Sequence, residues 1–157
     1  YLSIVRLLLD KKANPNIKDN NGMTPLHHAA QKGFPETAIE LAVRGADIKA
    51  QDTGGHEPVY FAFMNNHSKI VISLLSRGAS YTMRNNRGQT LLHWAAENGY
   101  MDVLEFLFTK NLNLNEKDKY GFVPLHLAAD HAQTEAVKAL LLKGADPNIP
   151  WPSTPLL

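Results

Sequence analysis

The chain repeats itself at a fixed interval of 33 residues, and this feature constrains its fold more than any other. The phrase NGMTPLHHAAQKG returns as RGQTLLHWAAENG and as YGFVPLHLAADHA, with a weaker copy that reads GGHEPVYFAFMNN. Gly22, Gly55, Gly88 and Gly121 mark the same position in the four copies. Repeats of this length are usually single supersecondary units that bury their apolar faces against their neighbours. The sequence therefore predicts a stacked array.

Each copy has the pattern of a loop followed by two short helices, and the first copy is the clearest example. The Asn and Asp residues before Gly22 tolerate left-handed backbone, and Gly22 adopts it without steric cost. Thr24 is a favourable helix cap and Pro25 suits a first helical turn, while Gly33 ends that helix. Pro35 opens the second helix. Neither helix is long enough to be stable alone, so stacking must bury their apolar faces.

Three sets of equivalent positions are predicted to form this buried surface. The first helices contribute larger apolar residues and alanines, and the small alanine side chain lets helices approach closely. The second helices contribute leucines. The sets are Leu26, Val59, Leu92 and Leu125; Ala29, Ala62, Ala95 and Ala128; and Leu41, Leu74, Leu107 and Leu140.

Composition removes several classes of function. The formal net charge of the 157 residues is +1, which gives no global attraction to nucleic acid or to an anionic membrane. The chain has no cysteine, which excludes a disulfide framework and a thiolate nucleophile and removes the commonest zinc ligands. No apolar run approaches the ~20 residues that a membrane span requires.

The repeated phrases resemble the ankyrin-repeat family, above all GMTPLHHAAQKG, VRGADIK, LSRGAS and LLLKGADPN. The resemblance covers nearly the whole chain. It implies one all-α domain, a solenoid of stacked helix-turn-helix units with short β-hairpin-like loops. The expected full copies are 19–51, 52–84, 85–117 and 118–150, with partial copies at 1–18 and 151–157. Because both ends break inside a copy and no initiator Met is present, we expect a fragment of a longer protein.

The second copy departs furthest from the common pattern. It carries Glu57 in place of a threonine, Tyr60 in place of the histidine and Phe63 where other copies have alanine. At the amino terminus, Ile4 and Leu8 lack the first helix against which they would pack. We expect that end to fray or to be covered by other sequence.

The paired histidines invite a catalytic or metal-binding interpretation, which their spacing does not favour. His27, His93 and His126 recur in one register, and a residue repeated in several units is a poor candidate for a single active site. The family resemblance implies that this His bridges the backbone and the threonine hydroxyl. His28 stands where other copies carry Phe61, Trp94 and Leu127, so we expect it to pack. We predict no enzyme activity of the segment itself, no cofactor and no metal site.

A second periodic set is basic. Lys11, Arg44, Arg77, Lys110 and Lys143 recur every 33 residues near the ends of the second helices. Each cation complements the negative end of a helix dipole, worth about 0.3–1 kcal/mol. Stacked together, they would alternatively form a docking strip for an acidic partner or a phospholipid. The sequence leaves both interpretations open.

The family resemblance implies a function in recognition rather than catalysis. Loop tips and first helices would form a concave surface that binds another protein or peptide, not nucleic acid, as a scaffold, adaptor or substrate recruiter. The alternative is a targeting or regulatory segment of a larger enzyme, channel or pathogen effector. We expect a monomer in the cytoplasm, with the nucleus as a second compartment.

Family positions carried over to this chain give the predicted partner-binding residues, with Arg87, Tyr120 and Phe122 as anchors, since interface hot spots favour aromatic residues and Arg. The complete set is Met23, Lys32, His56, Met64, Arg87, Gln89, Glu97, Tyr120, Phe122, Asp130 and His131.

The resemblance also implies one modification site. Asparaginyl hydroxylases modify the Asn that ends the Gly-Ala-Asp-x-Asn phrase of this family. Asn148 ends such a phrase, with Leu140 eight residues and Asp146 two residues before it. The chain would then be a substrate of a modifying enzyme.

Overall fold

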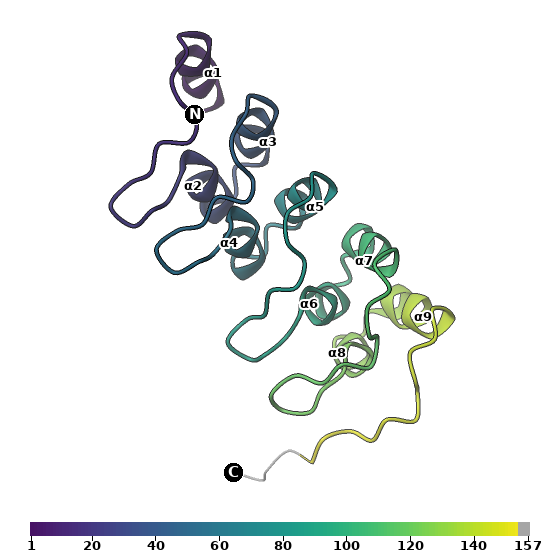
Figure 1. The fold of residues 1–157 in the computed structure, drawn as a ribbon. Helices are drawn as coiled ribbons and strands as arrows, with labels where there is room; N and C mark the ends of the chain where they lie inside the picture. Colours follow the sequence, from purple (N-terminus) through teal and green to yellow (C-terminus); the bar gives the residue numbers. More distant parts are fainter. Residues whose placement is uncertain (154–157) are drawn as a thin grey trace. The chain divides into compact units, whose positions relative to one another are not determined.

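A computed structural model describes residues 1–153, which form nine α-helices (Figure 1). The predicted all-α class is confirmed, and the loops of these residues contain a single isolated β-bridge, between Arg84 and Thr90. The helices are α1 (Leu2–Asp10), α2 (Pro25–Lys32), α3 (Pro35–Val43), α4 (Pro58–Met64), α5 (Ser68–Ser76), α6 (Leu91–Asn98), α7 (Met101–Phe108), α8 (Pro124–Asp130) and α9 (Thr134–Leu142).

The chain divides into two compact units, Tyr1–Tyr81 and Thr82–Leu157. We call the first helix of each copy the inner helix and the second the outer helix. In the first unit, inner helix α2 packs against α4 and against its own outer helix α3, while α3 also packs against α1 and α5. In the second unit, α6 packs against α7 and α8, and α9 packs against α7 and α8 (Figure 1). Each unit therefore has two layers of helices.

Inner helices α2 and α6 begin and end at residues that favour helix initiation and termination. Thr24 precedes α2 with extended backbone (φ −88°, ψ 167°), and Pro25 follows at a position where no N–H is needed. Gly33 ends α2 in the left-handed conformation, at φ 73°. Helix α6 has the same threonine and glycine at its ends, Thr90 and Gly99, but Leu91 stands in place of the proline.

The predicted buried columns are confirmed. All of their side chains are buried, and the most accessible, Leu125, is 9% exposed. The alanine column lies between 0% and 4% exposed, which fits the close approach of neighbouring inner helices within each unit. Burial of these faces stabilises helices that would not persist alone in water.

An imidazole ties the inner helix of the first copy to the loop that follows. The backbone N–H of Thr24 donates to His27 Nδ1 at 3.0 Å, and the Thr24 hydroxyl lies 2.9 Å from the same nitrogen. Because Nδ1 accepts, Nε2 carries the proton and donates to the carbonyl of His56 at 3.1 Å. His93 repeats this arrangement with Thr90 and with the carbonyl of Phe122.

The fourth copy keeps a reduced version of this bridge. His126 Nδ1 accepts from the Val123 backbone N–H at 3.4 Å, and its Nε2 donates to the carbonyl of Ile149 at 3.0 Å. Valine has no hydroxyl, so the second contact to Nδ1 seen at Thr24 and Thr90 is missing there.

The second copy holds its loop by other means. The Glu57 carboxylate accepts from the backbone N–H of Ser80 at 3.0 Å and from its hydroxyl at 2.7 Å. Tyr60, at the histidine position, stacks on His56 with ring centroids 4.1 Å apart. Phe63 is only 2% exposed, so the enlarged side chain is accommodated inside the unit.

The two ends of the described chain differ. Helix α1 has no buried side chain, and Ile4 and Leu8 are 62% and 53% exposed. At the other end, Trp151 stacks on His126 with ring centroids 4.6 Å apart. The rest of the predicted partial copy, 154–157, lies outside the described residues.

Replacement of His27 by alanine should destabilise the protein by about 2–3 kcal/mol, because a fully buried ring and its backbone hydrogen bonds are lost. Replacement of the adjacent His28, which is half-buried and pairs with Asp19 at the surface, should have a much smaller effect. Urea unfolding of both variants measures the difference. Equal losses would show that the bridge does not stabilise the fold.

The buried rings also make stability depend on pH. Burial lowers the pKa of His27 and of His93 below the ordinary value of 6.5, and the carbonyl hydrogen bond to each ring opposes this shift more weakly. The unfolded chain therefore takes up protons at these rings at a higher pH than the folded protein does. Their contribution to stability is complete above about pH 6.5 and is lost as the pH falls below it.

The urea concentration at the midpoint of unfolding should consequently decrease as the pH is lowered from 7.5 to 5.5. The matched variant carries both His27→Tyr and His93→Tyr, because tyrosine is the residue found at this position in the second copy, Tyr60. Its midpoint urea concentration should decrease less over this pH range, even though the variant is less stable. Unfolding curves at pH 7.5, 6.5 and 5.5 give the comparison. Parallel pH profiles for the two proteins would contradict the assignment.

Candidate partner-binding surface

Each loop tip is shaped by one Asp or Asn side chain that binds two backbone N–H groups. Asp19 Oδ1 accepts from Asn21 and Met23, both at 2.9 Å. The same contacts recur around Asp52, Asn85 and Asp118, with distances of 2.8–3.0 Å. These contacts hold the backbone of the turn without a β-hairpin ladder.

The turn hydrogen bonds stabilise the ionised carboxylates. The Met23 N–H and then the His28 side chain lower the pKa of Asp19. Burial opposes ionisation of Asp52, but the N–H groups of His56 and Gly54 outweigh it, so its pKa also lies below the ordinary 3.8. The contribution of these loops to stability is therefore present above about pH 4 and is lost as the pH falls below it.

Neighbouring loops within each unit are joined through their backbones. Thr53 N–H donates to the carbonyl of Asn21 at 2.9 Å, and Lys119 N–H donates to the carbonyl of Arg87 at 3.0 Å. Gly22 has φ 74°, and a Cβ there would lie 2.9 Å from the Thr53 nitrogen. The turn requires glycine both for its left-handed backbone and for the close approach of the next loop.

In the first unit, three of the four predicted partner-binding residues reach the surface. Lys32 is exposed at the end of α2, Met64 is 39% exposed at the end of α4, and the His56 side chain is 41% exposed at a loop tip. Met23 is only 8% exposed, so the expectation that it offers an accessible contact is wrong.

The second unit carries a charged cluster on its inner helices and loop. The half-buried carboxylate of Glu97 lies 3.2 Å from Arg87 Nη2 and 3.5 Å from His131 Nε2. His131 Nδ1 donates to the carbonyl of Leu127 at 3.0 Å, which orients its ring. Asp130 is exposed beside it. The cluster thus contains three of the predicted residues, with Arg87 and His131 both in contact with Glu97.

Aromatic side chains lie at the loop tip of the same unit. Tyr120 is 63% exposed, while Phe122 is half-buried and meets Trp151 edge to face at 6.3 Å. Gln89 is 1% exposed and binds Asn85 and Asp118, so it is part of the loop framework and not of an accessible surface. At Gln89, a loop position that varies between the copies therefore carries a side chain that stabilises the fold.

Two capping side chains escaped the sequence analysis. His67 Nε2 lies 3.2 Å from the carbonyl of Gln31, and Gln133 Nε2 donates to the carbonyl of Glu97 at 3.2 Å. Each stands just before an outer helix and contacts a carbonyl near the end of the inner helix of the preceding copy, α2 for His67 and α6 for Gln133. The 33-residue period places Gln133 and His67 at equivalent positions, and this equivalence is the sequence signal that could have identified them.

Most of the periodic basic residues make contacts within their own unit. Arg44 binds Asp10 at 2.8 Å and Glu40 at 3.3 Å, and the hydrogen bond to Asp10 raises the pKa of its guanidinium. The ammonium groups of Lys110 and Lys143 lie over phenyl rings, at 4.6 Å from Phe106 and 5.8 Å from Phe108. These contacts favour a local role near the helix ends.

Residues 1–153 contain no helix long and apolar enough to cross a membrane. The same residues bring together no group of three or more His, Asp or Glu side chains placed to hold a metal ion.

Comparison with known proteins identifies the family to which this architecture belongs. Residues 1–85 and 79–150 match the family model described as ankyrin repeats (3 copies). Human ankyrin repeat and KH domain-containing protein 1 is 45% identical over 47 residues, which cover 30% of this chain and 2% of that protein. The chain therefore matches only a small fraction of this relative. Because the family model covers most of the sequence and the helices pair as such repeats require, the chain belongs to the ankyrin-repeat family.

Proposed function

We propose that the chain is a recognition module that binds a folded protein or a peptide and acts as a scaffold, adaptor or substrate recruiter. Ankyrin repeats generally serve protein–protein interaction. The observation that carries the proposal is Tyr120, a large side chain that is 63% exposed on a loop fixed by two hydrogen bonds to Asp118. An exposed aromatic residue on a rigid loop contributes binding area at little cost in conformational entropy.

The chemistry around Tyr120 suggests what the partner offers. Arg87 is half-exposed and uses one guanidinium nitrogen for Glu97, so further donors face solvent. Phe122 provides apolar surface at the same loop tip. A segment with an apolar side chain beside a carboxylate or a free carbonyl would complement this surface. Met64 and Lys32 of the first unit are further contacts in the proposal.

A second candidate function is that of a targeting or regulatory segment in a larger enzyme, channel or effector. The comparison that favours it is the human relative, of whose length the aligned stretch is only 2%. Recognition would then direct another activity in the same polypeptide. Under either function we propose an intracellular monomer that has no catalytic activity of its own.

Asn148 remains a proposed substrate for an asparaginyl hydroxylase. Its side chain is exposed, and its backbone N–H donates to Asp146 Oδ1 at 2.8 Å. The equivalent residues Asn16 and Asn115 use their side chains to accept from the backbone of the following copy, at 2.7 Å and 2.9 Å. Exposure distinguishes Asn148 only in part, because Asn16 is exposed as well.

Partner binding should depend on Arg87 and Tyr120 together. We expect the double variant Arg87→Ala with Tyr120→Ala to bind a partner identified by affinity capture at least tenfold more weakly, since both anchors are lost. Tyr1→Ala, which removes another exposed tyrosine, should bind normally. Isothermal titration with the purified partner measures both affinities.

A partner that binds the double variant normally but fails to bind Arg44→Glu with Arg77→Glu would overturn this placement. Recognition would then lie on the basic outer-helix positions. Far-UV circular dichroism of each variant separates lost binding from lost folding.

A further inference from the structure

Three charged side chains meet in the second unit at positions that are neutral in the first. The second unit carries Arg87, Glu97 and His131 where the first, two repeat periods earlier, carries Asn21, Gln31 and Asn65. The carbonyl of the first position accepts from a backbone N–H of the next loop in both units, and the carbonyl of the second accepts from the side chain that precedes an outer helix. The framework therefore forms without these charges.

His131 keeps the hydrogen bond that asparagine makes at this position and adds a second nitrogen. The side-chain amides of Asn65 and Asn98 donate to the carbonyls four residues earlier, at 2.8 Å and 2.9 Å. His131 Nδ1 makes the same contact with Leu127 at 3.0 Å. Its Nε2, which has no counterpart in asparagine, lies 3.5 Å from Glu97. Histidine thus places an ionisable nitrogen beside a carboxylate and retains the local hydrogen bond.

The two contacts of the His131 ring are compatible with one protonation state. A carbonyl oxygen only accepts, so Nδ1 carries a proton. In a neutral ring Nε2 would then be an acceptor, and its lone pair would face an oxygen of Glu97. The imidazolium donates at both nitrogens and satisfies both neighbours. The contact with Glu97 is therefore favourable when the ring is protonated.

Protonation of the ring also changes the charge balance of the surface. The charged groups on the elements around the ring are Arg87 and Lys119 of the loops, Glu97 of α6, Asp130 of α8 and the Glu135–Lys138 pair of α9. The cations and the carboxylates of this set are equal in number, so the surface is neutral when the ring is neutral. A proton at His131 leaves one positive charge in excess, which attracts an anion.

Glu97 is the group that Arg87 and His131 share. Its side chain is 13% exposed, and its carboxylate lies 3.2 Å from Arg87 Nη2. When a protonated His131 compensates this carboxylate, the attraction that draws Arg87 to it becomes weaker. The Arg87 side chain is 51% exposed, so its N–H groups can then bind an anion that arrives from solvent.

The position of His131 is open in every copy, including those that a further copy follows. Its equivalents Lys32, Asn65 and Asn98 are all exposed. Asn98 is exposed although α8 packs against its own helix, α6. The access of a partner to His131 is therefore a property of the repeat.

We propose that the cluster of Arg87, Glu97 and His131 binds an acidic segment of the partner and takes up one proton at His131 as it does so. The inference rests on the function proposed above, to which it adds the charge of the partner and the pH dependence of binding. A carboxylate of the partner pairs with Arg87, and the imidazolium compensates Glu97. Because imidazole titrates in this range, binding strengthens as the pH falls from 7.5 to 6.0 and weakens as it rises.

Nuclear magnetic resonance with three matched peptides tests the proposal. The probes are GLEELEEG, GLQQLQQG and GLKKLKKG, which differ only in the charge of their polar side chains. The glutamate peptide should shift the side-chain signals of Arg87 and His131 in the 157-residue chain. It should bind about fivefold more tightly at pH 6.0 than at pH 7.5, because one charge is added to the surface. The other two peptides should shift neither signal.

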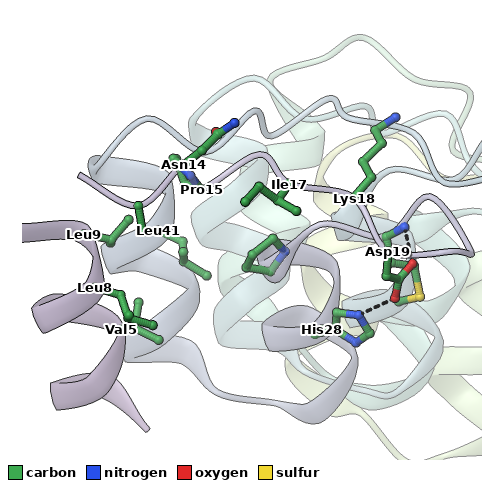
Figure 2. Close-up of a pocket in the computed structure, with 13 residues that line it drawn as sticks. Val5, Leu8, Leu9, Asn14, Pro15, Ile17, Lys18, Asp19, His28 and Leu41 are labelled. Atoms are coloured by element: carbon green, nitrogen blue, oxygen red, sulfur yellow. Dashed lines mark hydrogen bonds and ion pairs between the residues drawn. The ribbon is translucent and has the colours of Figure 1, made fainter. Parts of the chain in front are cut away.

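Two histidine variants provide the matched controls. His131→Asn can keep the hydrogen bond to the Leu127 carbonyl but loses the ionisable ring, so it should bind the glutamate peptide equally at both pH values. His28→Asn removes a ring of the first unit that pairs with Asp19 at 2.9 Å (Figure 2). This variant should retain the pH dependence.

Three results would overturn the inference. They are the absence of shifts with the glutamate peptide at pH 6.0, tighter binding of the lysine peptide, and a pH dependence that His131→Asn retains. The captured partner separates this inference from the function on which it rests. A partner that needs Arg87 and Tyr120 but binds equally at pH 6.0 and pH 7.5 would leave recognition at this surface in place and remove the proton uptake.

Discussion

The neutral imidazole at the third position of the inner helix joins local structure to repeat packing. His27 accepts from the start of its own helix through Nδ1 and donates to the following loop through Nε2. Only the uncharged ring can do both, so burial, tautomer and loop position are linked. One side chain therefore fixes where a helix begins and where the next loop lies.

The repeat explains why the fold could be predicted from the sequence and why part of the partner-binding surface could not. The helix pairs and buried columns follow from a 33-residue period, which averages over local uncertainty. The exposure of one side chain at one loop position cannot be averaged over the copies in this way, because the residue at that position differs between copies. Met23 and Gln89 were expected to face a partner, yet Met23 is 8% exposed, and Gln89 is 1% exposed and binds Asn85 and Asp118. Tyr120, which lies two positions earlier in the loop of its own copy, is 63% exposed.

The loops and the histidine bridges supply rigidity, and the residues between them remain open to variation. Asp118 binds the backbone N–H groups of Tyr120 and Phe122, which leaves both side chains unconstrained by the turn itself. A surface built in this way can change its contacts without changing its framework. The cluster of Arg87, Glu97 and His131 has the same character, because its side chains contact one another across elements already fixed by backbone hydrogen bonds.

The second copy shows how far the framework itself can change. It replaces the threonine–histidine pair with a Glu57 carboxylate bound to Ser80 and with Tyr60 stacked on His56. The loop is still closed by Asp52, as in the other copies. Loop closure and the histidine bridge are therefore separable, and a copy can lose the bridge while it keeps the loop. Tyr60 has no ring nitrogen, so this copy has no counterpart of the imidazole bridge at that position.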